Sequence, residues 1–586
     1  MIAAVFLSMI FTGILSGQGK TRLKQEIEQA LKEERLTGTV WSVVGSDGEV
    51  FSDAAGLKNL ETKENIKPTE DSTGRKARRF VDGAGRATRI YDPMGGVTKM
   101  RYNKFNRPVH LTDPLGRTGV LLHDAVGNIL EITDSKGGKV KYTYDAMSRP
   151  LTRTDQMNRV ETYSYDAYGN LWRATDHKGQ ITEFTYDVFN RPTLVKYGDN
   201  STTAYAYDEK GRVLSSTDSA AGTITYGYDA LDRVNSETTA AGTMLYGYDA
   251  GGRPVSMKAP NQPLVTYAYD TADRIQSITQ DNQTVSFTYD DVDRRQTMTL
   301  PNGVTAYYTY DAASQLKTLT YKRGATVLGD AAFEYDANGR RTRIEGSLAQ
   351  QLAPTPFSNA AYDNSNRQTQ ANAQALTFDQ NGNLTSDGTN TYTWNARDEL
   401  VAMTGPNLSA SFAYDGEGRR ISKTINGITT TYVYDGIQVV KEQQTAGPIT
   451  TQLAGSLDEV FWRKSTVNSN SNTEYLLTDA LGSTWGLADQ SGNVNTEYKY
   501  DVFGQTQSSG QTSATNNPLQ YTGRENDETG LYFYRNRYYS PNLRRFISRD
   551  PLREAAGENG YAYVSNSPTH VSDLVGLVPL RPVTEF

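Results

Sequence analysis

The stretch Tyr142-Thr-Tyr-Asp145 decides the fold, because its pattern returns along the chain at a nearly constant interval. The aspartates of successive copies lie 20 or 21 residues apart from Asp145 to Asp311. A single globular core would not impose such a period, whereas stacked copies of one structural unit would. We therefore expect a repeat protein. The further copies are Tyr163-Ser-Tyr-Asp166, Phe184-Thr-Tyr-Asp187, Tyr205-Ala-Tyr-Asp208, Tyr226-Gly-Tyr-Asp229, Tyr246-Gly-Tyr-Asp249, Tyr267-Ala-Tyr-Asp270, Phe287-Thr-Tyr-Asp290 and Tyr308-Thr-Tyr-Asp311.

Each copy has the pattern of a strand followed by a tight turn. Aromatic residues two positions apart lie on one face of a strand, where they can stack against the next unit. The aspartate and a following glycine or asparagine suit a turn, as in Asp208-Glu-Lys-Gly-Arg212. We expect such strands over residues 73–501. A stripe of tyrosines stabilises a sheet, but an exposed stripe would also stack on sugar rings, so a carbohydrate-binding module stays open as an alternative.

Two polar stretches of low complexity, residues 465–472 and 508–517, interrupt the later repeats. Their serine and asparagine content is typical of surface loops without regular structure.

The composition excludes several classes of site. Lys and Arg total 60 against 67 for Asp and Glu, which gives a net charge of −7 without a basic stripe, so nucleic acid is not an expected partner. The absence of cysteine removes disulfides and thiolate chemistry. The four histidines do not form a ligand-spaced cluster, so we expect neither a metal site nor a cofactor.

The amino-terminal part has a different character from the repeats. Residues 1–19 are apolar over the length of a signal peptide, which predicts a secreted or cell-surface protein, although a short buried segment is the alternative. Residues 20–72 predict a charged helix and a hairpin, and resemble the start of serine beta-lactamase-like hydrolases. The Ser-x-x-Lys motif of that family is missing here. Since Ser314-Gln-Leu-Lys317 falls in a repeat turn, we expect this fragment to be inactive.

The carboxyl-terminal part carries a second, more specific pattern. It reads Tyr521-Thr-Gly-Arg-Glu-Asn-Asp-Glu-Thr-Gly-Leu-Tyr-Phe-Tyr-Arg-Asn-Arg-Tyr-Tyr-Ser-Pro541 and continues through Phe546-Ile-Ser-Arg-Asp-Pro551. Together with the repeats, this stretch resembles the core region of Rhs and YD-repeat proteins, which are related to the C-component shells of Tc toxins and to teneurin shells. The resemblance covers about 500 residues.

The resemblance implies a fold and an activity. The fold is mainly β: a ribbon of YD repeats spirals into a hollow shell, and the core region, residues 502–577, plugs it. In relatives the shell encloses a toxic polypeptide, and the plug is an aspartyl autoprotease that releases it. The residues that match the protease motifs are Arg537, Asp550 and Asp573, and the cut would fall between Leu577 and Val578.

Three departures from the family pattern bear on that activity. Leu574 stands in place of a proline, and Arg553 and Arg544 stand in place of glycines. An arginine at a glycine position is disfavoured where φ is positive. The alternative is a structural plug in which Asp550 and Asp573 only cap turns.

The segment after the expected cut is short. Residues 578–586 are too few to build an enzyme. From the sequence we therefore expect a toxin-delivery shell without a recognisable cargo, whose partners would be delivery machinery or a cell-surface glycan or protein. Self-cleavage would occur at most once per molecule.

Overall fold

The computed structural model describes residues 41–44, 50–53, 69–70, 76–510, 517–577 and 581–582. The expected signal peptide and the charged helix lie outside the described residues. Two strands of the expected amino-terminal hairpin are present, since β1 (Trp41–Val44) pairs antiparallel with β2 (Val50–Asp53).

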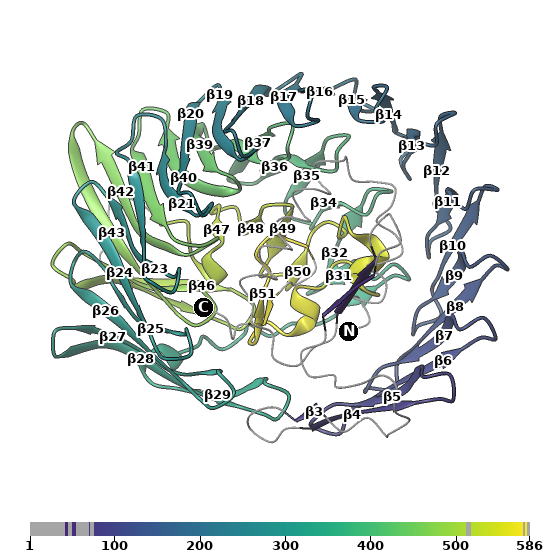
Figure 1. Ribbon diagram of the computed structural model, residues 1–586, viewed down its shortest axis with the longest axis horizontal. Coiled ribbons are helices and arrows are strands. Elements are labelled where there is room, and N and C mark those ends of the chain that lie inside the picture. The colour runs from purple at the N-terminus through teal and green to yellow at the C-terminus, as the bar shows by residue number, and fades with distance from the viewer. Residues whose placement is uncertain are drawn as a thin grey trace.

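The repeats form two long antiparallel sheets, which confirms the prediction of a mainly β shell. The first sheet runs from β3 (Thr69–Glu70) through β4 (Lys76–Val81) to β29 (Arg341–Glu345), with strands paired in chain order. The second is a 14-stranded sheet from β33 (Thr377–Phe378) to β46 (Thr506–Gly510). Figure 1 shows the first sheet curling around the molecule. We call residues 76–510 the wall.

One polar stretch is strand and not loop. β42 (Val460–Val467) and β43 (Asn470–Thr478) form a hairpin that includes most of residues 465–472. The prediction of an irregular loop there was wrong, because these residues face one another across two paired strands, Ser465 opposite Asn472 and Thr466 opposite Ser471. Thr466 and Ser471, for example, share a hydrogen bond of 2.9 Å between their hydroxyl oxygens. The second polar stretch begins inside β46, and residues 511–516 lie outside the described part.

Asp and Arg close each repeat turn. Asp208 accepts the backbone amides of Lys210 and Arg212 at 3.0 and 2.8 Å, and its other oxygen binds Nε of Arg212 at 2.6 Å. The guanidinium of Arg212 then lies 4.4 Å from the ring centre of Tyr228, one unit further along. The turn of one repeat is thereby fixed to the strand of the next. The same Asp–Arg pair recurs at Asp145–Arg149, Asp187–Arg191, Asp229–Arg233, Asp249–Arg253, Asp270–Arg274 and Asp290–Arg294.

The two sheets join through a shared aromatic core. Phe287 of β24 (Gln283–Tyr289) packs on Phe461 of β42 with ring centres 5.7 Å apart. Tyr321 packs on Trp485 at the same separation. These contacts belong to a buried cluster that includes residues of both sheets.

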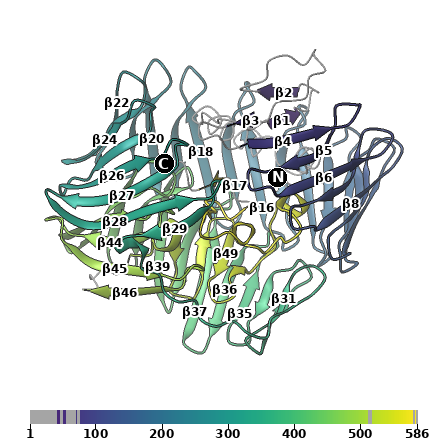
Figure 2. The same cartoon turned by 90° about the horizontal axis from the view of Figure 1, so that it is seen from below.

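The carboxyl-terminal region lies inside the curve of the wall, as Figures 1 and 2 show from two directions. Its four-stranded sheet consists of β47 (Glu525–Asn526), β48 (Tyr532–Tyr534), β49 (Arg537–Ser540) and β50 (Arg545–Phe546). We call residues 517–577 the plug. Its own core is aromatic, and the ring centres of Tyr539 and Tyr563 are 4.6 Å apart.

Candidate functional site: a buried arginine between two carboxylates

The plug brings the three predicted site residues together. Arg537 opens β49, Asp550 follows β50, and Asp573 follows β51 (Val571–Ser572). Nη2 of Arg537 lies 2.9 Å from Oδ2 of Asp550 and 3.5 Å from Oδ2 of Asp573. All three residues are at most 3% exposed. Segments up to 36 positions apart therefore converge on one guanidinium nitrogen.

The remaining donors of Arg537 fix its orientation. Nη1 donates to the carbonyl of Gly560 at 3.0 Å, and Nε donates to the carbonyl of Gly576. The guanidinium also lies 3.6 Å from the ring centre of Phe546. Burial lowers the pKa of Arg537, and the two aspartates act against this shift. The arginine is thus held directly beside the backbone that precedes Leu577.

Asp573 holds the turn that leads to the expected cut. Its Oδ1 accepts the amides of Gly576 at 2.8 Å and of Val575 and Leu577 at 3.2 Å each. Within the described residues, Oδ2 is buried without a hydrogen bond and has Arg537 as its ion-pair partner. Burial raises the pKa of Asp573 to about 6, against the opposing effect of Arg537 and the three amides. A protonated carboxyl is therefore accessible here near neutral pH.

Asp550 lies closer to Arg537 than Asp573 does. Its Oδ1 accepts the amide of Leu552 at 2.8 Å, and its own amide donates to the carbonyl of Gly560 at 2.8 Å. Burial raises its pKa and the nearby Arg537 lowers it. Because Asp550 is the closer partner of Arg537, it is the member of the pair that more readily stays ionised. One protonated and one ionised carboxyl is the arrangement that peptide hydrolysis by an aspartate pair requires.

The chain is held on both sides of the expected cut. Upstream, Asp573 binds the amides as far as Leu577. Downstream, β52 (Arg581–Pro582) pairs antiparallel with β51. The expected cut therefore falls in the connection between two paired strands, and that connection starts at Asp573. Leu577 is described, whereas Val578 lies outside the described residues.

Gly576 cannot be replaced without displacement of the backbone. Its φ is +72°, and a Cβ there would come within 2.1 Å of the carbonyl oxygen of Tyr534. Such a contact is far inside van der Waals range, and a positive φ is unfavourable for other residues. The close approach keeps the turn after Asp573 pressed against β48.

The two arginines at family glycine positions do have positive φ. The φ of Arg553 is 56° and that of Arg544 is 60°, which costs about 1–2 kcal/mol for an L-residue. Contacts with the wall offset this cost. Arg553 Nη1 lies 2.7 Å from both Glu161 Oε2 and the hydroxyl of Tyr163. Arg544 lies 4.3 Å from the ring centre of Phe503.

Leu574 is tolerated in place of proline for a different reason. The turn is closed by the side chain of Asp573 and needs no fixed φ at the next position. The carbonyl of Leu574 accepts hydrogen bonds from Arg535 and, at 3.4 Å, from Arg524. Sequence reasoning missed both arginines, although Arg535 lies only two positions before Arg537 in the same motif.

Sequence reasoning also missed the ion pairs that fix the plug to the wall. Arg420 of β38 (Arg420–Ile425) is fully buried between Asp527 and Glu525 of the plug. Glu554 of the plug accepts from Tyr142 at 2.9 Å and pairs with Arg153 of the wall. These partners are more than 100 positions apart, and no local pattern indicates such contacts.

The remaining sequence-predicted residues have structural contacts. The second tyrosine of a repeat donates its hydroxyl to a backbone carbonyl 14 or 15 residues earlier, as Tyr228 does to Val213 at 2.7 Å and Tyr248 to Val234 at 2.8 Å. These hydroxyls are thus engaged within the wall, and the carbohydrate-binding alternative stays a prediction. The amide of Ser314 donates to the carbonyl of Asp311 in a repeat turn.

Two further observations concern sites of other kinds. Among the described residues, no three His, Asp or Glu side chains are grouped so that they could bind a metal ion. In the same part of the chain, no helix has the length and apolar character needed to cross a membrane.

The fold and the site define a hollow β-shell with an internal plug that carries a carboxylate pair. The family model of the teneurin YD shell matches residues 86–303 and 294–563, which is more than half of the chain. The chain therefore belongs to the teneurin YD-shell family, as the sequence resemblance predicted.

Relatives resemble this chain over part of its sequence, and a solved structure shares its fold. The tRNA3(Ser)-specific nuclease WapA of Bacillus spizizenii is 35% identical over 222 residues, which are 36% of this chain and 9% of the relative. The double-stranded DNA deaminase toxin A of Burkholderia cenocepacia is 27% identical over 228 residues, which are 32% of this chain and 16% of the relative. The crystal structure of TcdB2-TccC3-TEV superimposes with a TM-score of 0.66 at 17% identity, and covers 92% of this chain and 36% of that one.

The comparisons bear on the expected lack of cargo. The relatives named as nucleases and toxins are far longer than the stretch they share with this chain, which spans less than a fifth of either. A chain that matches only part of such proteins gives no ground for calling the shell empty. The absence of cargo is therefore not part of the function that we propose.

Proposed function

We propose that this chain is the shell of a toxin-delivery protein of the Rhs type, and that its plug cuts the chain once, between Leu577 and Val578. The observation that carries this proposal is the buried Arg537, which lies between Asp550 and Asp573 and also binds the carbonyl of Gly576. A turn cap alone would not need two buried carboxylates on one guanidinium. The proposed setting is a secreted or cell-surface protein, with the delivered polypeptide as its partner.

The proposed reaction is hydrolysis of one peptide bond. Ionised Asp550 takes a proton from a water molecule, whose oxygen attacks the carbonyl carbon of Leu577. Protonated Asp573 gives its proton to the carbonyl oxygen. Arg537 stabilises the negative charge that the carboxyl group of Asp573 then carries. The bond from that carbon to the nitrogen of Val578 then breaks, and the nitrogen leaves as an amine with the proton that Asp550 had taken up. Asp573 takes its proton back from one of the two hydroxyl groups on the same carbon, which leaves Leu577 with a carboxylic acid. The pKa of about 6 for Asp573 supports its role as the acid.

The intact mass of the purified chain tests the proposal. The native chain should lack residues 578–586, and Asp573→Asn should retain them, because an amide has no acidic proton to transfer. The matched control is Asp501→Asn, since Asp501 is a buried aspartate that caps a turn by accepting the amides of Phe503 and Gln505 at 2.8 and 2.9 Å. The control should be cut like the native chain. A native chain that keeps its tail would refute the proposal.

A further inference from the structure

The backbone behind the Asp573 turn is held by side chains of the plug. The carbonyl of Leu574 accepts from Nη1 of Arg535 and from Nη1 of Arg524. The carbonyl of Val575 accepts from Nδ2 of Asn536 at 2.7 Å. Because these carbonyls directly follow Asp573, the same contacts set where the carboxyl of Asp573 lies relative to Arg537.

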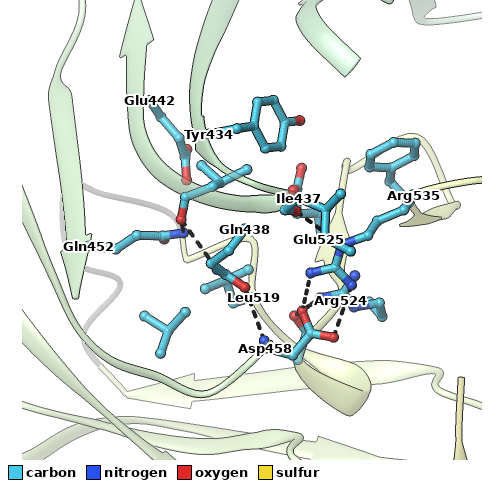
Figure 3. Close-up of a pocket in the computed structure, with 14 residues that line it drawn as sticks. Tyr434, Ile437, Gln438, Glu442, Gln452, Asp458, Leu519, Arg524, Glu525 and Arg535 are labelled. Carbon is cyan, nitrogen blue, oxygen red and sulfur yellow. Dashed lines mark hydrogen bonds and ion pairs between the residues drawn. The ribbon is translucent and has the colours of Figure 1, made fainter. Parts of the chain in front are cut away.

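The two arginines are in turn anchored on the wall. Asp458 lies in the turn between β41 (Ile449–Ala454) and β42. Its Oδ1 binds Nη2 of Arg535 at 2.6 Å and also pairs with Arg524, and its Oδ2 binds Nη1 of Arg535 at 3.1 Å. Figure 3 shows Asp458 below the guanidinium groups, among the wall and plug residues that line a pocket.

Asp458 pairs with two buried cations, Arg524 and Arg535. Burial lowers the pKa of Arg524 to about 9, with the neighbouring Arg535 adding to the shift, and burial lowers the pKa of Arg535 to about 10. The side chain of Asp458 is 6% exposed and contacts both cations. Two buried guanidiniums close together repel each other unless an anion lies between them. Asp458 supplies such an anion from a different part of the fold and contacts both cations directly, while the carboxylates of Glu525 and Asp573 act on the same two arginines.

The wall also supplies a backbone contact to the same arginine. Nε of Arg535 donates to the carbonyl of Ile437 at 3.1 Å, and the amide of Asp458 donates to Oε1 of Gln438 at 3.0 Å. All the donors of Arg535 described here are thus divided between the wall and the carbonyl of Leu574. Of these contacts, only the hydrogen bond to Leu574 lies within the plug, so before the plug meets the wall Arg535 would lack every wall contact that fixes its guanidinium.

We propose that Asp458 is a positioning residue for the cut, so that the plug acquires its cutting geometry only when it is seated against this turn of the wall. The inference rests on the proposed function. It adds that closure of the shell and cleavage are coupled: an unseated plug lacks the anchored Arg535 that places the Asp573 turn. Cleavage would then follow assembly of the compartment.

The first test measures hydrogen exchange in the Asp573 turn and does not depend on cleavage. Asp550→Asn should prevent the proposed cut, and it removes none of the hydrogen bonds that Asp573 makes to the amides of residues 575–577. In that background, Asp458→Asn should raise the hydrogen-exchange rate of the amides of residues 575–577 at least tenfold. The matched control is Lys423→Met, which removes another wall-to-plug ion pair, that of Lys423 Nζ with Asp527 Oδ1 at 2.8 Å. The control should leave those amides protected, and unchanged protection in Asp458→Asn would overturn the inference.

The second test follows the cut itself in the full chain. Asp458→Asn should slow the loss of residues 578–586 at least tenfold, and Asp458→Glu should restore part of the rate because it returns the anion. A rate in Asp458→Asn equal to the native rate would also overturn the inference. If the native chain is not cut at all, the proposed function fails, while the exchange experiment still decides whether Asp458 positions the turn.

A charge-matched variant guards against simple misfolding. Asp458→Asn combined with Arg524→Leu removes one buried anion together with one buried cation, so the remaining charge is the same as in the native pocket. This double variant should melt closer to the native temperature than Asp458→Asn alone and still lose protection at residues 575–577, because Arg535 has lost its anchor and Leu574 has lost its bond from Arg524. Full protection with full cleavage in the double variant would contradict the inference.

Discussion

In the wall, Asp208 and Arg212 form a pair near the surface, whereas in the plug Arg537 lies between two carboxylates that are almost inaccessible to water. Despite some desolvation, the amide and guanidinium of Arg212 hold the pKa of Asp208 below its ordinary value. Burial raises the pKa of Asp573 instead. An aspartate beside an arginine thus closes a turn in the wall, whereas in the plug it becomes a group that can donate a proton. The two settings differ in how completely water is excluded from the carboxyl group.

The largest expected effect comes from removing a cation that the plug buries. Arg420→Met leaves Asp527 and Glu525 without their principal partner, and breaking such a buried pair costs about 3–5 kcal/mol. We expect a lower melting temperature and faster proteolysis of residues 517–577. A variant that melts at the native temperature would show that the plug tolerates unpaired charge, and the contrast with the wall would fail.

A smaller effect is expected from crowding the turn next to the site. In Gly576→Ala the new methyl group meets the carbonyl of Tyr534, and we expect cleavage to fall at least tenfold because the Asp573 turn moves. Gly530→Ala is the matched control: its φ is +82°, and a Cβ there has no atom within 4 Å. The control carries the same backbone strain, about 1–2 kcal/mol, without the clash. Equal cleavage in both variants would refute the role of the close approach.

The raised pKa of Asp573 predicts in which direction the stability of the folded chain changes with pH. Asp573 binds its proton more tightly in the folded chain, where its pKa is about 6, than at its ordinary value of 3.8. The folded state therefore loses stability as the pH rises between these values, by about 1–3 kcal/mol in total. In the uncut Asp550→Asn background the melting temperature should fall as the pH rises from 4 to 7.5, and this fall should be smaller when Asp573→Asn is added, because the titrating carboxyl is gone. A fall of the same size in both variants would contradict the raised pKa.

The smallest effect is expected in the wall. Arg212→Ala removes a pair in contact with solvent and one stacking contact on Tyr228, so the melting temperature should change far less than in Arg420→Met. The remaining difference should shrink at high salt, because salt screens exposed charges. A loss as large as that of Arg420→Met would show that the repeated pairs hold the wall together cooperatively.

The fold could be predicted because the same strand-and-turn pattern recurs many times in the sequence. Tyr144, Tyr165 and Tyr186 each mark the end of a strand, and each aspartate that follows caps a turn. The prediction failed where it was based on amino-acid composition alone. Residues 465–472 have the composition of a loop but pair as a hairpin. Cross-strand pairing depends on a partner strand, and composition carries no information about that partner.

The candidate site could be predicted only in part. Arg537, Asp550 and Asp573 belong to short motifs, and the structure brings them together. Asp458 and Glu161 belong to no motif, because their importance comes from a plug that reaches them across 77 or more positions of chain. The positive φ of Arg553 was foreseen as a difficulty, but its wall partner could not be.

The central claim is that the plug cuts one defined bond, and the most direct measurement sequences the product. A reporter domain joined after Phe586 would be released by the cut, and the account predicts that the released reporter begins at Val578. Asp550→Asn and Asp573→Asn should each leave it attached, while Asp501→Asn should not. A reporter that stays attached to the native chain, begins at another residue, or is released from the two site variants would contradict the account.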